Sequence, residues 1–357
     1  MSKKIVCQLY LPSFGRSYGK NSLREIFVLL PYLKKAGFSG VYLIALWESG
    51  CYDNGFDVVD YKIDPAYGVE TTLKLIVDRC HQLGMEIGLD VIPNHVSDKH
   101  ELAQKCLEGI SGYEDVLYVV SKEEAERLTK AGVPSFFGSK PYSDFGDKYV
   151  RTTFCDYRQL NLNWHSSVVQ RYFRELFSKL QGMGIDFARV DCAGLLLEDV
   201  SKADSSNPLA VYDFGRSVQA LRAVNGDMRL FCEWFDPGSA AIFENMPEAY
   251  ALDCSYVLTG QQNTEWHHRK LVPLIGGHDQ MTLSDRGLRY DDILRKIESS
   301  ECEYAFSDLQ SVTGHHTDPE IKPEDKLFDA DVNNPNQRYR ARRPIHDVIR
   351  VFKDFYS

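Results

Sequence analysis

Residues 84–95 read Gly-Met-Glu-Ile-Gly-Leu-Asp-Val-Ile-Pro-Asn-His, and this stretch is the clearest guide to the architecture of the chain. A segment of helical periodicity ends at the glycine, a short apolar strand follows over residues 86–91, and polar side chains come directly after that strand. This order is typical of a parallel βα unit, whose strand is buried on both faces of the sheet.

The same unit recurs on both sides of this stretch. Apolar runs at residues 5–10 and 41–45 precede segments with apolar residues at helical spacing, at residues 21–37 and 71–83. Further along, we predict strands at residues 185–190, 228–232, 249–256, 272–275 and 302–306, and helices at residues 168–180, 211–224 and 344–355. Eight strands that alternate with helices predict an α/β fold, the closed (β/α)8 TIM barrel.

Residues 96–160 interrupt this alternation. They combine the charged run at residues 122–127, which we expect to form a solvated helix face, with a Gly, Pro, Ser and Tyr-rich run at residues 132–146. Connections this long in a compact domain commonly form a lid or a small subdomain. We therefore predict a barrel made of residues 1–95 and 161–357, with residues 96–160 inserted after its third strand.

Composition and charge exclude several classes of protein. The 357 residues carry 51 acidic and 41 basic side chains, so the net charge of −10 disfavours nucleic acid or an anionic membrane as partner. No apolar run is long enough to span a membrane, and we see no secretory signal. The nine cysteines are dispersed without a Cys-x-x-Cys pair, so we expect free thiols in the cytoplasm and no zinc site.

Polar side chains gather at the ends of four predicted strands. They are Asp90, Asn94, His95, Arg189, Asp191, Glu233, His278 and Asp279. In a barrel of this kind the loops at the C-terminal ends of the strands converge on one mouth, which is where the chemistry takes place. Taken singly, each residue could equally cap a helix or pair with a neighbour. Taken as an ordered set, they predict one polar site at the mouth.

These strand ends resemble the α-amylase superfamily, glycoside hydrolase family 13. The motifs, in the order usual for the family, are Asp90-Val-Ile-Pro-Asn-His95, Gly184-Ile-Asp-Phe-Ala-Arg-Val-Asp191, Phe231-Cys-Glu233 and Gly277-His-Asp279. Shorter stretches are also similar to family segments, at residues 8–10, 54–61, 63–68 and 159–163. The resemblance covers residues 5–280 and implies that the insertion at residues 96–160 is the family's domain B.

The resemblance implies catalytic roles for three carboxylates: Asp191 as nucleophile, Glu233 as general acid and base, and Asp279 as stabiliser of the transition state. A retaining glycosidase needs the first two carboxylates about 5 Å apart. Arg189, on the same strand face as Asp191, would keep that carboxylate ionised. We expect the aromatic residues that flank Glu233, at positions 231, 234 and 235, to raise its pKa toward the working pH.

The resemblance also implies residues that bind the reacting sugar ring. His95, His278 and Asp57 are candidates for hydrogen bonds to its hydroxyl groups. Phe56 stands where the family usually has tyrosine and is a candidate for stacking on the sugar. Substrate contacts are therefore predicted for Phe56, Asp57, His95, Arg189, Trp234 and His278. Aromatic residues at a barrel mouth pack into the core about as often as they stack on a sugar.

The sequence departs from the family at several positions. Gly194 and Leu195 replace a lysine and a histidine of many endo-amylases, so starch cleavage is disfavoured and one calcium ligand is lost. We expect no obligatory cofactor, calcium being possible but dispensable. Thr282 stands where exo-acting α-glucosidases commonly have arginine, and residues 278–283 look more like trehalose-synthase-like members. Too few residues follow Asp279 to form the C-terminal domain usual in the family. We expect the barrel surface that this domain normally covers to be covered by a second copy of the chain in a homodimer.

Three functions stay open at this stage. The preferred one is an exo-acting, retaining glycosidase that cleaves the α-glucosidic bond of a disaccharide or short oligosaccharide through a covalent intermediate. The first alternative is glucosyl transfer or isomerisation, as in trehalose-synthase-like members, or phosphorolysis. The second is an amylase-like protein that binds carbohydrate without catalysis.

Overall fold

The computed structural model describes residues 3–11, 22–50, 55–136, 140–153, 158–255, 263, 265–275 and 289–308. The predicted helix at residues 344–355 lies outside these ranges, and so do His278, Asp279 and Thr282.

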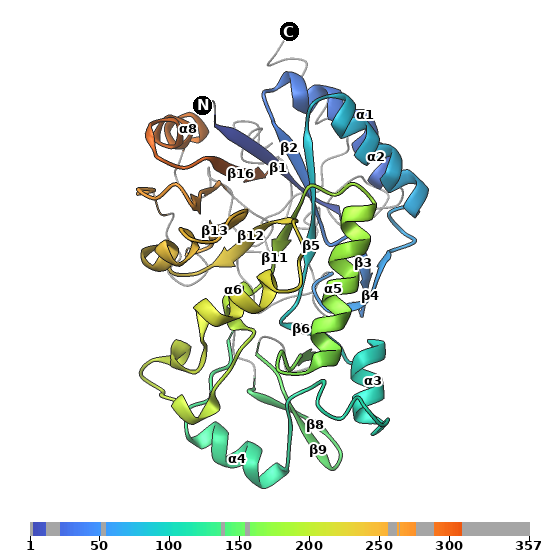
Figure 1. Cartoon of the computed structure of the whole chain (residues 1–357), viewed down its shortest axis with the longest axis vertical. Coiled ribbons are helices and arrows are strands. Elements are labelled where there is room, and N and C mark those ends of the chain that lie inside the picture. The colour runs from blue at the N-terminus through green and yellow to red at the C-terminus, as the bar shows by residue number, and fades with distance from the viewer. Residues whose placement is uncertain are drawn as a thin grey trace, which may run out of the picture.

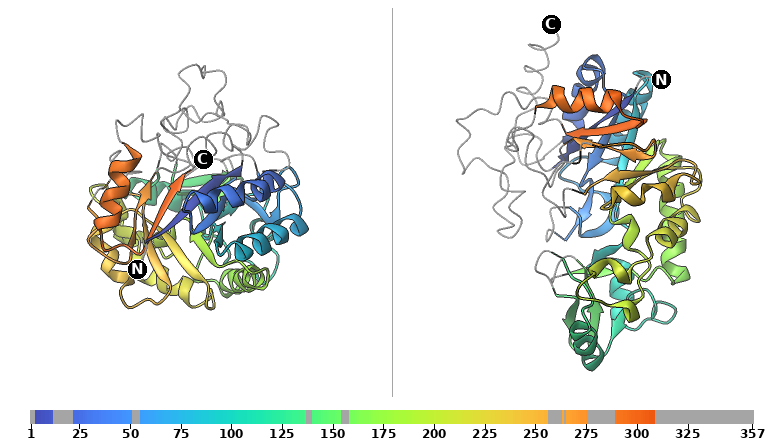
Figure 2. Two further views of the ribbon diagram at one scale, coloured as in Figure 1. Left: turned by 90° about the horizontal axis from the view of Figure 1, so that it is seen from above. Right: turned by 90° about the vertical axis from the view of Figure 1, so that its left-hand side faces the viewer.

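One parallel sheet forms the centre of the molecule. Its strands are β1 (Lys4–Tyr10), β2 (Gly40–Ile44), β5 (Glu86–Val91), β11 (Phe187–Val190), β12 (Arg229–Trp234), β13 (Ala249–Asp253), β14 (Leu271–Val272), β15 (Leu274–Ile275) and β16 (Tyr304–Asp308). They follow one another in the order β14-β13-β12-β11-β5-β2-β1-β16-β15. Viewed end on, the strands form a ring with helices on its outer side (Figure 2). The predicted TIM barrel is confirmed.

The ring closes through the stretch predicted as one strand at residues 272–275. β14 pairs with β13 on one side and β15 pairs with β16 on the other, and only Pro273 separates the two short strands. Proline has no N–H to give to a sheet, so the seventh position of the ring is interrupted at this residue. The nine strands therefore occupy eight positions.

Five α-helices lie outside the ring in the described part of the chain beyond residues 95–160: α1 (Ser22–Lys35), α2 (Glu70–Gln82), α5 (Ser167–Gly182), α6 (Phe214–Arg222) and α8 (Tyr290–Ser299). Each presents an apolar stripe to the strands, as α1 does with Leu23, Ile26 and Leu30. Gly37 and Gly84, predicted as helix ends, follow α1 and α2 with φ of 93° and 62°. The predicted helix at residues 211–224 is shorter, because Asp213 caps α6 at the Arg216 N–H.

The connection between β5 and α5 forms elements of its own. They are β6 (His95–Ser97), α3 (Glu101–Leu107), β7 (Val119–Val120), α4 (Lys122–Lys130), β8 (Tyr142–Phe145), β9 (Lys148–Arg151) and β10 (Gln159–Asn161). β7, β9 and β8 make a small antiparallel sheet, which lies with α4 at one end of the molecule (Figure 1). The charged run does form a helix face, since α4 buries only Ala125 and Leu128.

Shorter elements complete the mouth of the barrel. A hairpin of β3 (Trp47–Ser49) and β4 (Val58–Ile63) follows β2. The connections after β11 and β12 contain the 3-10 helices η2 (Ala193–Leu195), η3 (Val200–Lys202), η4 (Pro208–Val211) and η5 (Pro237–Phe243). In the described part of the chain, none of the helices combines the length and the apolar character that crossing a membrane requires.

Aromatic rings fill the interior of the barrel below the mouth. The ring of Phe231 meets those of Phe187 and Phe306 edge to face, with centroids 5.1 and 4.8 Å away. A Cβ on Gly88 would lie 1.9 Å from the ring of Phe187, so only glycine fits there. This packing closes the barrel below the mouth and leaves polar side chains to the C-terminal ends of the strands.

The opposite end of the barrel carries an ion-pair network. Arg229, the first residue of β12, donates from Nε to Glu248 at 2.7 Å and from Nη1 to Glu86 at 3.0 Å. Lys4 also pairs with Glu86, at 2.8 Å. These residues lie at the N-terminal ends of the strands, where barrels of this type keep stabilising contacts away from the chemistry.

His100 gives the fold a measurable pH dependence. Its buried ring caps α3 by accepting from the Leu102 N–H at 3.1 Å, and its other nitrogen lies 2.9 Å from the Tyr172 hydroxyl. Burial lowers the pKa of His100 to about 4. Between this value and the ordinary pKa of about 6.5, the unfolded chain binds one proton more than the folded chain, so the free energy of unfolding falls as the pH drops.

We predict that His100 costs about 3 kcal/mol of folding free energy between pH 7 and pH 4, at about 1.4 kcal/mol per pKa unit. Denaturant unfolding across this range is the measurement. In His100→Asn, which keeps a capping oxygen, the free energy of unfolding falls by about 3 kcal/mol less between pH 7 and pH 4 than in the wild type. The control is His165→Asn at an exposed position, for which we expect the same fall as in the wild type. An equal slope in the His100 variant and the wild type would contradict the prediction.

Candidate active site

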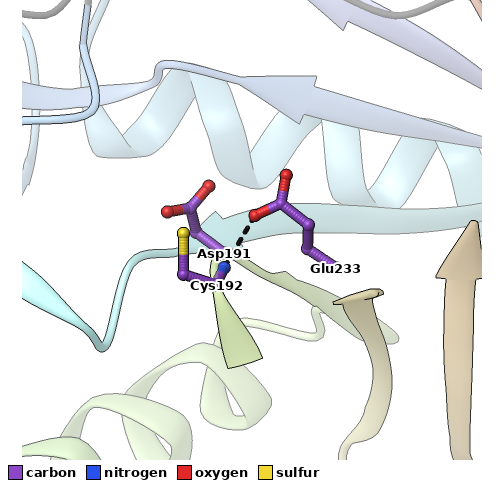
Figure 3. A group of neighbouring side chains, drawn as sticks. All are labelled: Asp191, Cys192 and Glu233. Carbon is purple, nitrogen blue, oxygen red and sulfur yellow. Dashed lines mark hydrogen bonds between the residues drawn. The ribbon is translucent and has the colours of Figure 1, made fainter. Parts of the chain in front are cut away.

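Three neighbouring strands bring the acidic residues together. β5, β11 and β12 run in parallel, and their register sets Arg189 opposite Asp90 on one side and opposite Phe231 on the other. Two residues further along both strands, Asp191 and Glu233 come side by side. A carboxylate oxygen of each lies within 4.8 Å of the other and of the Cys192 sulfur (Figure 3).

Arg189 lies among three carboxylates. Its Nη1 is 2.5 Å from Asp191 Oδ1 and 3.1 Å from Asp90 Oδ1, and its Nη2 is 2.7 Å from Glu233 Oε1. All four side chains are buried. Although burial alone would lower the pKa of Arg189, the charge of Glu233 and the other acids raises it well above the ordinary value. The guanidinium is therefore a permanent cation that holds the carboxylates of Asp191 and Glu233 in fixed positions relative to each other.

Glu233 contacts a cation and a backbone N–H donor. Besides Arg189, the Cys192 N–H donates to Glu233 Oε2 at 2.7 Å (Figure 3). The ring of Phe231 packs deeper in the barrel, against Tyr250, Tyr304 and Phe306. A cation and an N–H donor both favour the ionised carboxylate. The expected effect of the aromatic residues at positions 231, 234 and 235 on the pKa of Glu233 stays a prediction.

The side chain of Trp234 lies away from Arg189 and its carboxylate partners. Successive residues of a strand point to opposite faces, so Trp234 leaves β12 on the side away from Glu233. Its ring packs against Phe214 and Phe243, and its Nε1 donates to Ser239 Oγ at 2.9 Å. The structure thus gives Trp234 a packing role on the outer face of the barrel.

Cys192 is the contributor that sequence reasoning missed. Its backbone lies in the left-handed region, with φ of 47° and ψ of 36°, which is uncommon for a residue with a side chain. This conformation accompanies the N–H···Glu233 bond. Burial, with the charges of Asp191 and Glu233, raises the pKa of the thiol well above its usual value, so the sulfur stays protonated. No motif in the sequence signals such a backbone conformation.

Two predicted sugar contacts, His95 and Phe56, lie beside these charged groups, and a third, Asp57, is buried. His95 is buried, with Nδ1 3.2 Å from Asn94 Oδ1. Burial lowers the pKa of His95, against the charge of Asp191, so its ring is neutral. The guanidinium carbon of Arg189 lies over the ring of Phe56, 5.9 Å from the centroid of that ring. The following residue, Asp57, is fully buried.

Asn94 and Leu195, the two positions considered for calcium from the sequence, lie in contact with each other. Asn94 Nδ2 donates to the Leu195 carbonyl at 2.7 Å, which joins the two segments directly. Leu195 has no ligand atom in its side chain. A Cβ on Gly194 would lie 2.2 Å from the ring of Phe214, so no larger side chain fits at that position.

Asp191, Cys192 and Glu233 have the residue types of metal ligands, but their proximity has another cause. Arg189 already pairs with both carboxylates, and the thiol is protonated. Predicted contributions from His278 and Asp279 lie outside the described residues.

In a comparison with protein families, residues 8–252 match the alpha amylase catalytic domain. Trehalose-6-phosphate hydrolase of Bacillus subtilis is 28% identical over 203 residues, which is 55% of this chain and 36% of that protein. Oligo-1,6-glucosidase of Bacillus sp. (strain F5) is 26% identical over 215 residues, 58% of this chain and 42% of that protein. A trehalose synthase/amylase of Mycobacterium tuberculosis is 30% identical over 186 residues, 50% of this chain and 30% of that protein.

Solved structures agree in fold. Trehalose-6-phosphate hydrolase of Bacillus licheniformis superposes with a TM-score of 0.69 at 19% identity, over 87% of this chain and 65% of that one. A single-site mutant of the trehalulose synthase MutB superposes with a TM-score of 0.74 at 18% identity, over 98% of this chain and 72% of that one. The chain thus spans about a third to two fifths of the length of the curated relatives it matches.

Proposed function

Because the chain belongs to the alpha-amylase family by its catalytic domain, we propose that it is an exo-acting, retaining glycosidase for the α-glucosidic bond of a disaccharide or short oligosaccharide. The observation that carries the proposal is the pair Asp191 and Glu233, whose carboxylate oxygens lie within 4.8 Å of each other. Retaining glycosidases place their two carboxyl groups about 5 to 5.5 Å apart, whereas inverting enzymes need at least about 6.5 Å to hold a water molecule.

In the first step, Asp191 attacks the anomeric carbon and forms a glycosyl ester. The bond from that carbon to the leaving oxygen breaks, and Glu233 gives its proton to this oxygen, so the aglycone departs neutral. Arg189 pairs with the nucleophile and holds its carboxylate in position.

In the second step, the ionised Glu233 takes a proton from the incoming water, whose oxygen attacks the anomeric carbon and releases Asp191. Two inversions give net retention. We assign stabilisation of the oxocarbenium-like transition state to Asp279, and contacts with the reacting ring to Phe56, Asp57, His95 and His278. We propose that neither step requires a metal.

A small sugar is the proposed partner and the cytoplasm the proposed location. The described cysteines are all buried and none forms a disulfide, which suits a reducing compartment: Cys7, Cys80, Cys106, Cys192, Cys232, Cys254 and Cys302. Transfer of the glucosyl group to a sugar, or isomerisation, is the second candidate. It is favoured by the similarity to a trehalose synthase/amylase.

The test is a panel of α-linked disaccharides, each with and without a phosphate group, whose products are followed by NMR. We expect free glucose, released first as the α-anomer. Glucose 1-phosphate would indicate phosphorolysis, and a rearranged disaccharide would indicate isomerisation. A first product with the β-configuration would overturn the assignment of Asp191 as nucleophile. Binding without turnover would favour a carbohydrate-binding protein.

A further inference from the structure

A buried ion pair joins two connections at the mouth of the barrel. Arg151, the last residue of β9, comes from the connection between β5 and α5. Glu198 comes from the loop at residues 192–213, which follows β11 and lies near α4 in Figure 1. Their side chains are 0% and 3% exposed.

Each donor nitrogen of Arg151 has a partner. Nε and Nη2 donate to the two Glu198 oxygens, the shortest contacts being 2.9 Å to Oε1 and 2.8 Å to Oε2. Nη1 donates to the carbonyls of Pro141 and Thr152 at 3.1 and 2.6 Å. Nη2 also donates to the Tyr212 hydroxyl at 3.1 Å. A fully hydrogen-bonded buried pair of this kind fixes geometry more reliably than it adds stability.

The pair closes the base of the loop. Glu198 and Tyr212 face each other in an antiparallel bridge. Backbone bonds on either side, from the Asp199 N–H to the Val211 carbonyl at 2.7 Å and from the Asp213 N–H to the Leu197 carbonyl at 3.0 Å, complete the closure. Movement of Arg151 therefore acts on both arms of this loop.

The loop leads back to the catalytic acid. Tyr212 belongs to one apolar cluster with Cys192 and Leu195. The Cys192 N–H donates to Glu233, and the Leu195 carbonyl accepts from Asn94. Arg151 thus holds the base of a loop whose first residue, Cys192, carries a hydrogen-bond donor to the proposed general acid.

We propose that Arg151 is a positioning residue for catalysis: through Glu198 and Tyr212 it holds the loop at residues 192–213 so that the Cys192 N–H keeps the Glu233 carboxylate aimed at the bond to be broken. This inference rests on the proposed function. Lysine cannot replace Arg151 fully, because an ammonium group offers one compact charge where the guanidinium forms a planar fork on Glu198 and reaches Tyr212 as well.

The experiment compares Arg151→Lys, Arg151→Met and Tyr212→Phe with Arg229→Met as matched control. The control removes an arginine with two carboxylate partners at the opposite end of the barrel. Hydrogen exchange of the peptide that covers residues 191–199 reports on the loop without requiring turnover. Assays are run well below the melting temperature of each variant, and kcat, KM and the pH profile are measured.

We expect Arg151→Met to speed exchange in this peptide and to lower kcat by about 10²-fold, as misplacement by about 1 Å does. KM changes little, and Arg151→Lys falls between wild type and Arg151→Met. The alkaline limb of kcat/KM moves to higher pH, because Glu233 loses an N–H donor that favours its ionised form. Arg229→Met lowers the melting temperature but leaves kcat within about 2-fold of wild type.

Unchanged exchange in Arg151→Met overturns the proposal, and so does faster exchange with unchanged kcat. If Arg151→Met does not fold, Tyr212→Phe decides: a fall in kcat of about 5-fold, the worth of one hydrogen bond, supports the proposal and an unchanged kcat overturns it. If the wild type cleaves no α-glucoside, the proposed function fails, and exchange at residues 191–199 still decides whether Arg151 holds this loop.

Discussion

An Asp191→Asn variant loses at least about 10⁴-fold in kcat on every α-glucoside that the wild type cleaves, because the amide cannot form the glycosyl ester. Its size and shape are those of aspartate, and Arg189 keeps Asp90 and Glu233 as partners. Sugar binding is therefore retained. Initial rates and calorimetric titration with an uncleaved disaccharide measure the two effects separately.

Asp186→Asn is the matched control for this variant. Asp186 lies just before β11, at the other end of the strand, where it accepts from the Ile87 N–H at 2.8 Å. Its replacement leaves kcat within about 2-fold of wild type. A rate for Asp191→Asn close to that of Asp186→Asn would mean that another group is the nucleophile.

A Glu233→Gln variant shows a loss that depends on the leaving group. For a disaccharide, whose departing hydroxyl needs a proton, kcat/KM falls by about 10²- to 10⁴-fold, the usual contribution of a general acid. For glucosyl fluoride, or a dinitrophenyl glucoside, the first step needs no proton and is largely spared. Glutamine has nearly the shape of glutamate and keeps one acceptor oxygen, which serves either the Cys192 N–H or Arg189 but not both.

The second step still lacks its base in this variant, so a burst of leaving group followed by a slow steady state is expected with the activated donors. Rapid-mixing kinetics measure the burst. Glu244→Gln, on the connection after β12, serves as control because Glu244 is exposed and contacts His268. An equal loss for both kinds of leaving group in Glu233→Gln would remove Glu233 from the role of acid.

The repeating part of the fold was predictable because it depends on local patterns. Buried parallel strands such as β5 are short apolar runs, and helices such as α1 show their apolar stripe at regular spacing. The split of the seventh strand at Pro273 was not predicted as such, although the proline was visible. An apolar run shows that a strand is present, but its pairing depends on both neighbours in the ring.

The site was predictable as a set of strand ends and unpredictable in its contacts. That Arg189 reaches Glu233 depends on the register between β11 and β12, which the sequence does not contain. The left-handed backbone of Cys192 also depends on tertiary structure. The placement of Trp234 could have been found, because strand alternation puts it on the face opposite Glu233.

The split at Pro273 has a mechanical consequence for the catalytic centre. Within the described residues, two residue pairs join the ring on each side of the proline, whereas β12 and β13 share five. Fewer backbone hydrogen bonds hold the ring at this seam, so we expect local opening of the sheet to begin there. β5, β11 and β12 pair with one another away from the seam, so we expect Asp191 and Glu233 to keep their register when it opens.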